Sequence, residues 1–383
     1  MFDVQVLTST RAEYGLLRTL IFRMQQEEEL KVSTLVTGMH LSDEFGQTYR
    51  QIEEDGVEIA VKIPILLSND DPASVSKAMG LAMLGFADYF AAHRPDCIIV
   101  LGDRFETLAV CCAAFNEHIP VVHLHGGEKT EGALDEAYRH AITKLSCLHF
   151  ASTEEYRRRV IQLGENPGTV FNTGALGVEN VKNLKLPDLS NIENDIGFSL
   201  RQPYAVVTFH PSTMEKDSEQ QCHALIDAMD AHAELRYLCT KANADAGGRL
   251  INRMLEEFAA ERDNVILVDS LGALKYLCAV KHAALVLGNS SSGLLEVPSF
   301  GVPTVNIGSR QKGRIRAESV IDCESETKDI IDAISKALSN EMQEKARSVH
   351  NPYEGHDTSG IMTREIIKML KEKKTNVKTF YDI

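Results

Sequence analysis

Short apolar runs alternate with longer amphipathic stretches along almost the whole chain, and this alternation constrains the fold more than any other feature. The runs expected to be buried strands are 4–9, 32–38, 97–103, 121–125, 148–152, 169–174, 204–210, 235–240, 264–270, 284–290 and 303–308. Each is followed by a pattern typical of an amphipathic helix. Strands that alternate with helices pair in parallel through right-handed crossovers. The pattern therefore predicts an α/β protein with doubly wound parallel sheets.

The strand pattern is interrupted once, by the polar stretch at 181–203 that contains Pro and several Asn. A chain of 383 residues is also too long for one core, because domains commonly hold roughly 150 residues. We expect two Rossmann-like domains that face a cleft, formed by residues 1–180 and 181–354. The amphipathic stretch 358–374 predicts a terminal helix, and we expect 355–383 to cross back onto the first domain.

The charge and the cysteines exclude several classes of protein. The net charge is −15, with 55 acidic and 40 basic residues, which argues against a nucleic-acid or anionic-membrane partner. No run approaches the ~18 apolar residues of a membrane span, and the N-terminus lacks a signal-peptide pattern. The eight cysteines include no CxxC pair, which favours buried, reduced thiols. We expect a cytoplasmic protein without a membrane partner.

A small-residue turn, LGNSSSGLLEVP at 287–298, follows one predicted strand. Ligands of such sheets bind beyond the carboxyl ends of the strands. Ser290, Ser291 and Gly293 would offer hydroxyls and amides to a diphosphate at a helix N-terminus, and Glu296 could bind the hydroxyls of a ribose. The alternative is a plain Ser N-cap. Because the chain has neither a Walker loop nor a GxGxxG fingerprint, a nucleotide would bind without a P-loop.

Arginines follow several predicted strands, namely Arg11, Arg104 and Arg310. On an acidic protein, forked guanidinium groups at strand ends are suited to binding a phosphate. The alternative is that each arginine forms an ordinary surface or interdomain ion pair.

The stretch HLHGGE at 123–128 admits three interpretations: a metal site, an acid/base site or a phosphate cradle. No HExxH motif or distant cysteine pair supports a metal, so we expect none. Groups for proton transfer are present in Glu128, Asp103, Asp135 and His210, because a carboxylate cluster beside a histidine can separate the pKa values of its members. Helix capping by the acids is the alternative.

Taken together, these motifs resemble those of the UDP-N-acetylglucosamine 2-epimerase family. They comprise STRAEYG, TGMH, LGDR, HGGEKT with DE-x2-RH, FHP, GNSSSG followed by Glu, and G-x-RQ-x-GR. Within the family, the details are similar to those of the hydrolysing branch that feeds bacterial sialic acid synthesis. The resemblance covers nearly the whole chain, and it implies a glycosyltransferase-B-like fold.

The resemblance also implies a reaction and a set of site residues. UDP-N-acetylglucosamine would lose its C2 proton and UDP to give 2-acetamidoglucal, and water would then add to give N-acetylmannosamine, without a cofactor or metal. Asp103 and Asp135 would be acid/base groups, and Glu296 would bind the ribose. The diphosphate would be held by Arg11, Arg104, His210, Ser290, Ser291 and Arg310. Family members are commonly homodimers or homotetramers, and we expect the same here.

One position departs from the family pattern and leaves two questions open. Many hydrolysing members carry an acidic residue in HIEGGE where this chain has His125, so either His125 or Glu128 would take its proton-transfer role. Close relatives act on UDP-N,N'-diacetylbacillosamine in the legionaminic acid pathway, which is the alternative substrate. A glycosyltransferase of the same fold is the alternative enzyme, and a sensor of nucleotide sugars is the non-catalytic alternative.

Overall fold

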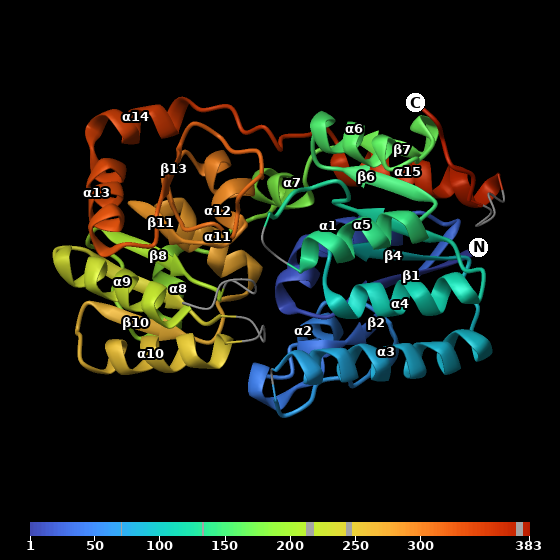
Figure 1. The fold of residues 1–383 in the computed structure, drawn as a ribbon, viewed down its shortest axis with the longest axis horizontal. Helices are drawn as coiled ribbons and strands as arrows, with labels where there is room; N and C mark the ends of the chain where they lie inside the picture. The colour runs from blue at the N-terminus through green and yellow to red at the C-terminus, as the bar shows by residue number, and fades with distance from the viewer. Residues whose placement is uncertain (70, 132–133, 212–217, 243–246, 373–377) are drawn as a thin grey trace. The chain divides into compact units, whose positions relative to one another are not determined.

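The chain folds into two compact units. The structure is a computed structural model that describes residues 1–69, 71–131, 134–211, 218–242, 247–372 and 378–383. Unit 1 contains Met1–Glu128, Asp135–Asn180 and Tyr353–Ile383, and unit 2 contains Lys129–Leu134 and Val181–Pro352. Figure 1 shows each unit as a sheet with helices on both sides.

Unit 1 is built on a parallel sheet with the strand order β3-β2-β1-β4-β5-β6-β7. Its strands are β1 (Phe2–Thr8), β2 (Leu30–Thr37), β3 (Ile59–Ile63), β4 (Cys97–Leu101), β5 (Val121–Leu124), β6 (Leu148–Ala151) and β7 (Val170–Asn172). Its helices are α1 (Arg11–Gln25), α2 (Tyr49–Glu54), α3 (Pro72–Ala92), α4 (Phe105–Asn116), α5 (Asp135–Leu145), α6 (Glu154–Gln162), α7 (Leu176–Asn183), whose last residues belong to unit 2, and α15 (Thr358–Lys371).

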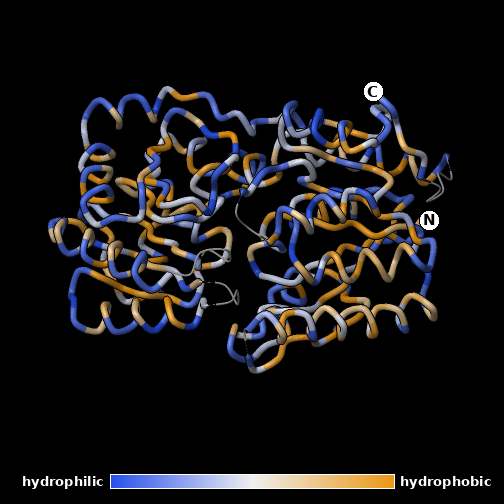
Figure 2. The backbone as a smooth tube through the Cα atoms, viewed as in Figure 1, coloured by the Kyte–Doolittle hydropathy of each residue, from blue (hydrophilic) through white to orange (hydrophobic). Residues whose placement is uncertain are grey.

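The central strands of unit 1 are apolar on both faces. Every residue of β4, CIIVL, is buried, as expected for a parallel strand that is covered by helices on both sides. Two clusters of buried side chains line the two faces: one includes Leu17 and Leu20 of α1, and the other includes Phe86 and Phe90 of α3. In Figure 2 the hydrophobic colour accordingly runs along the strands of the unit. This core fixes the strand ends that carry the site residues.

The terminal helix α15 packs in unit 1, where its side chains Met362, Ile366 and Met369 join the cluster that contains α1. Figure 1 shows α15 (red) in the same unit as the blue N-terminal segment. The apolar positions at i, i+4 and i+7 form the stripe that such packing needs. Residues 373–374, included in the expected helix, lie outside the described residues.

Unit 2 repeats the plan with the parallel order β10-β9-β8-β11-β12-β13. Its strands are β8 (Tyr204–Thr208), β9 (Arg236–Thr240), β10 (Val265–Val268), β11 (Leu285–Gly288), β12 (Thr304–Ile307) and β13 (Val320–Cys323). Its helices are α8 (Leu189–Ile196), α9 (Ser218–Ala231), α10 (Gly248–Ala260), α11 (Gly272–His282), α12 (Ser292–Leu295), α13 (Thr327–Leu338) and α14 (Asn340–Ser348). Short 3-10 helices lie at Gly38–Leu41, Asp43–Phe45, Pro167–Thr169 and Val297–Phe300.

One boundary differs from the expected division at residue 180. The segment Lys129–Leu134, expected in the first domain, belongs to unit 2. The Glu131 N–H donates to the Lys312 carbonyl at 2.9 Å, and a Cβ on Gly313 would lie 3.1 Å from the Cβ of Lys129. Backbone pairing and close packing therefore attach this segment to the loop after β12.

No helix among the described residues is long and apolar enough to span a bilayer.

Candidate functional site

Polar side chains of unit 1 gather where β4 and β5 end. Gly102 and Asp103 follow β4, and His125 to Glu128 follow β5. The two strands are neighbours in the sheet, so their carboxyl ends lie at the same edge. The Gly102 N–H also donates to the Leu124 carbonyl at 3.0 Å. The two predicted motifs LGDR and HLHGGE are thus brought together.

His125 has the most unusual geometry in this group. Its φ of 64° places a residue that is not glycine in the left-handed region, which costs about 1–2 kcal/mol. The imidazole is buried, and its Nδ1 lies 3.1 Å from Glu128 Oε1. Its Nε2 has no hydrogen-bond partner among the described residues. If Nδ1–H donates to the carboxylate, Nε2 keeps a lone pair that can accept a proton.

Glu128 is positioned to orient His125. Its side chain is buried, and its Oε1 also accepts a hydrogen bond from Ser152 Oγ at 3.0 Å. A carboxylate that holds one imidazole nitrogen and leaves the other nitrogen for proton transfer is the arrangement of a catalytic dyad. The sequence left open whether His125 or Glu128 takes the proton-transfer role. In the structure Glu128 holds the imidazole through Nδ1, and His125 offers Nε2.

The two glycines of the loop are required for packing. Gly127 has a φ of 79°, and a Cβ on it would lie 2.3 Å from the Tyr156 carbonyl oxygen of α6. A Cβ on Gly126 would lie 3.0 Å from His123 Nδ1. Close contact with the α6 backbone at Gly127, and with the His123 side chain at Gly126, explains both glycines without a phosphate cradle.

Arg139 of α5 connects the carboxylates at this edge. It is completely buried, and its guanidinium donates to Asp103 Oδ2, to Glu136 Oε2 at 2.7 Å and to the Glu128 carbonyl at 2.8 Å. Asp135, the remaining acid/base candidate, is the first residue of the same helix. One buried cation thus fixes the position of Asp103 and the loop end at Glu128.

His123 is a neutral residue of the core. Its Nε2 lies 2.8 Å from the Gly102 carbonyl, its Nδ1 lies 3.2 Å from Thr143 Oγ1, and burial lowers its pKa to about 3. Both ring nitrogens are therefore engaged by protein groups. Among the described residues, no three His, Cys, Asp or Glu side chains group closely enough to bind a metal ion.

The two arginines of unit 1 that were predicted to bind phosphate, Arg11 and Arg104, lie in neighbouring βα turns. Arg11 begins α1 behind a capping box of Thr10 and Glu13, and burial lowers the pKa of Arg11. Arg104 is the N-cap residue of α4, and its Nε donates to the buried Glu106 Oε1 at 2.6 Å. Part of the Arg104 guanidinium is therefore already bound by a carboxylate.

In unit 2, Asn289 joins three of the strand-end segments. Its Oδ1 accepts from the His210 N–H at 2.7 Å, and its Nδ2 donates to the His210 carbonyl at 2.8 Å. Its own carbonyl accepts from Arg310 at 3.1 Å and from Gln311 at 2.8 Å. The turns after β8, β11 and β12 are thus held together by one side chain and its carbonyl. His210 and Arg310, predicted from separate motifs, are brought to the same place.

The serine turn differs in detail from the expectation. The helix that follows it, α12, has only four residues and is continued by a 3-10 turn, so its dipole is weak. The Gly293 N–H already donates to the Ser290 carbonyl at 3.2 Å, and a Cβ on Gly293 would lie 2.7 Å from Thr304 Cγ2. Ser291 is the N-cap residue, and Glu296 lies buried at the C-cap. Gly293 thus serves packing against β12.

Two residues that hold the site together were not among the predicted site residues. Arg139 and Asn289 lay inside quoted motifs, DE-x2-RH and GNSSSG, but the sequence pattern gave them no role. The only available signal was the presence of a polar residue beside a predicted strand end or on the buried face of a helix.

Comparison with known proteins decides the family. The model of the family described as UDP-N-acetylglucosamine 2-epimerase matches residues 23–371. The chain belongs to this family. The resemblance inferred from the motifs is thereby confirmed, including its hydrolysing branch, to which similar proteins belong by name.

Two relatives of this 2-epimerase family member are similar over most of the chain. A Campylobacter jejuni protein named GDP/UDP-N,N'-diacetylbacillosamine 2-epimerase (hydrolyzing) is 42% identical over 341 residues, which cover 88% of each chain. An Escherichia coli protein named polysialic acid biosynthesis protein P7 is 39% identical and covers 100% of this chain and 98% of its own.

The fold is shared with a solved structure of the family. The crystal structure of UDP-GlcNAc 2-epimerase from Neisseria meningitidis, bound to UDP-GlcNAc, superposes with a TM-score of 0.79 at 19% identity, covering 96% of this chain and 100% of that one. The predicted class, two doubly wound α/β domains of the glycosyltransferase-B type, is confirmed.

Proposed function

We propose that the protein is a hydrolysing 2-epimerase of a UDP-linked 2-acetamido sugar. The observation that carries the proposal is the pair of His125 and Glu128 beside the Asp103–Arg139 pair, at the ends of the adjacent strands β5 and β4. Inversion at C2 needs a proton to leave one face of the sugar and return to the other. That chemistry requires two proton-transfer groups, and unit 1 offers His125 and Asp103, with Asp135 as a third candidate.

The proposed reaction has two steps, elimination of UDP and addition of water. A base removes the C2 proton while the C1–O bond to UDP breaks, which forms the C1=C2 double bond of a 2-acetamidoglucal. Water then adds its oxygen to C1, and a proton is delivered to C2 from the opposite face. The products are UDP and the free sugar with C2 inverted. His125, oriented by Glu128, is the group that we assign to one of these proton transfers.

The strand-end cluster of unit 2 is assigned to UDP. Ser290, Ser291 and Arg310 offer hydroxyl and guanidinium donors to the diphosphate, and the buried Glu296 offers a carboxylate to the ribose hydroxyls. His210, which Asn289 holds through both backbone groups, adds an imidazole at the same edge. Arg11 and Arg104 of unit 1 remain candidates for the diphosphate.

We propose UDP-N,N'-diacetylbacillosamine as the substrate. The sequence motifs alone placed UDP-N-acetylglucosamine first, but the 42% identical relative is named for the diacetylbacillosamine sugar, which favours the alternative. UDP-N-acetylglucosamine remains the second candidate because the relative that covers the whole chain is named for polysialic acid biosynthesis.

The test is a proton NMR time course in heavy water with each nucleotide sugar separately. The two substrates are compared by kcat/KM. We expect kcat/KM for the diacetylbacillosamine compound to be at least tenfold higher. Its product should be a free sugar with inverted, deuterated C2, formed in equal amount with UDP. Preference for UDP-N-acetylglucosamine would select the second substrate. A nucleotide sugar retained as product would exclude hydrolysis, and no reaction without an acceptor would favour the glycosyltransferase.

A further inference from the structure

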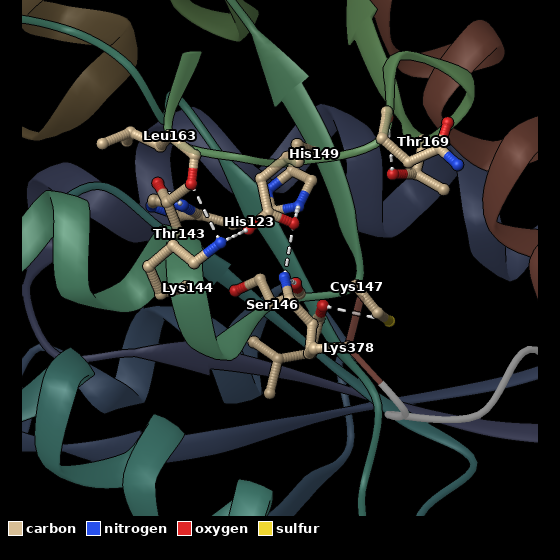
Figure 3. Close-up of polar contacts among 12 residues, drawn as sticks. His123, Thr143, Lys144, Ser146, Cys147, His149, Leu163, Thr169 and Lys378 are labelled. Carbon is tan, nitrogen blue, oxygen red and sulfur yellow. Dashed lines mark hydrogen bonds and ion pairs between the residues drawn. The ribbon is translucent and has the colours of Figure 1, made fainter. Parts of the chain in front are cut away.

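A buried carboxylate at the C-terminal end of α5 binds three basic side chains from distant parts of unit 1. Glu165, in the loop after α6, accepts from Lys144 Nζ at 2.7 Å, from His149 Nε2 at 3.0 Å and from Lys378 Nζ. Burial would raise its pKa, but the bonds from His149, Lys144 and Lys378 hold that pKa to about 2. Figure 3 shows Lys144, Ser146, His149 and Lys378 gathered at this corner. Glu165 is therefore a charged junction between α5, β6 and the C-terminal segment.

The C-terminal segment is attached here by several contacts. We call residues 378–381 the clasp. Lys378 Nζ also donates to the Ser146 carbonyl, just beyond α5, and the Tyr381 N–H donates to the Gly164 carbonyl at 2.9 Å. The Phe380 ring covers Gly164 so closely that a Cβ there would lie 2.3 Å from it. Lys144 Nζ lies 5.2 Å from the centroid of the same ring.

The other end of α5 carries the proton-transfer cluster. Asp135 begins the helix, and Arg139 binds Asp103 and the Glu128 carbonyl. At 1.5 Å per residue, Arg139 and Ser146 lie about 10 Å apart along the axis. The helix is therefore held by the clasp at one end and holds the candidate catalytic groups at the other.

A second path joins the two ends through the sheet. His149 of β6 pairs in register with His123 of β5. His123 in turn contacts the Gly102 carbonyl, one residue before Asp103, and Thr143 of α5. These contacts couple the position of α5 to the strand end that carries Asp103.

From these contacts we infer that Lys378 and Glu165 are positioning residues for proton transfer, because they fix the axial position and rotation of α5. An ammonium group at a helix C-terminus satisfies carbonyls that otherwise lack donors. Catalytic groups lose effectiveness when they shift by about 1 Å. The catalytic part of this inference rests on the proposed function.

The experiment compares Lys378→Met with Lys378→Arg and with the matched control Lys371→Met in the full chain. Lys371 forms a surface ion pair with Glu29 in the same unit, so it controls for loss of one lysine. Turnover of both nucleotide sugars and hydrogen exchange of the 135–145 peptide are measured for each variant. For Lys378→Met we expect kcat to fall at least tenfold with KM changed less than twofold, and exchange in α5 to accelerate.

The arginine variant should recover most of kcat, and the Lys371 control should match the wild type in both readouts. Unchanged exchange in α5, or faster exchange with unchanged kcat, would overturn the inference. A parallel rise in KM and loss of kcat, without rescue by arginine, would reduce Lys378 to a structural residue. If the wild-type protein converts neither sugar, the proposed function fails, while hydrogen exchange still decides whether the clasp fixes α5.

Discussion

At the scale of single residues, His125 is the position where geometry and chemistry are most closely linked. Asparagine tolerates the left-handed region but cannot transfer a proton, so His125→Asn separates the two properties. We expect kcat to fall at least about 100-fold, with UDP affinity changed less than threefold. Turnover by UDP release and UDP binding by calorimetry measure these effects. Ser152→Ala, which removes only a donor to Glu128, should cost much less. Near-normal turnover of His125→Asn would remove it from the mechanism.

The residues of the site were predictable to different extents. Asp103, His125 and Arg310 could be named because polar residues at strand ends are visible in the sequence. The roles of Arg139 and Asn289 could not be named, because their partners are far away in the chain: Asp103 is 36 residues from Arg139, and His210 is 79 residues from Asn289. Likewise, no sequence pattern gives the positive φ of His125. These contacts between residues far apart in the chain form only when the chain folds, so no local sequence pattern reveals them.

At the scale of an element, the loop after β5 depends on Gly127. Gly127 and Gly46 have nearly the same φ, 79° and 78°, but a Cβ would meet the Tyr156 carbonyl at Gly127 and nothing within 4 Å at Gly46. Gly46→Ala should therefore cost only the backbone strain, about 1–2 kcal/mol. Gly127→Ala should cost roughly 2–5 kcal/mol and also lower turnover by moving His125 and Glu128. Urea unfolding and kcat of both variants give the comparison, and equal costs would show that the contact with α6 is unimportant.

Most strands were predicted from the sequence, and two were missed. Most of the predicted strands lie inside the sheets, where both faces are buried and the sequence is continuously apolar, as in β4 and β8. The edge strands β7 and β10 were also predicted. The two missed strands, β3 and β13, are edge strands with partly exposed residues. An edge strand needs no continuous apolar run, so its signal is weak. The contacts of Lys129 and Glu131 with the loop at 312–313 could likewise be known only from the fold.

At the scale of the whole molecule, the buried histidines predict how stability depends on pH. His40 bonds to Thr8 and Thr48 through its two nitrogens, and burial lowers its pKa to about 4. Burial likewise lowers the pKa of His123 to about 3. Both lie in unit 1. The ordinary pKa of histidine is about 6.5. Below this pH, these histidines bind protons in the unfolded chain but stay neutral in the folded chain. The neutral histidines therefore stabilise unit 1 fully above pH 6.5, and this stabilisation declines as the pH falls toward 4.

This dependence can be measured by urea unfolding, followed by circular dichroism, between pH 7 and pH 5. Each buried histidine should lower the free energy of unfolding by up to about 1.4 kcal/mol per pH unit below 6.5. His40→Gln, which keeps groups able to hydrogen-bond to the two threonines, should reduce this slope by up to that amount. His356→Gln, at an exposed position of the same unit, should leave the slope unchanged. An identical slope in wild type and His40→Gln would mean that His40 accepts a proton without unfolding, and that the turn after β2 opens to water first.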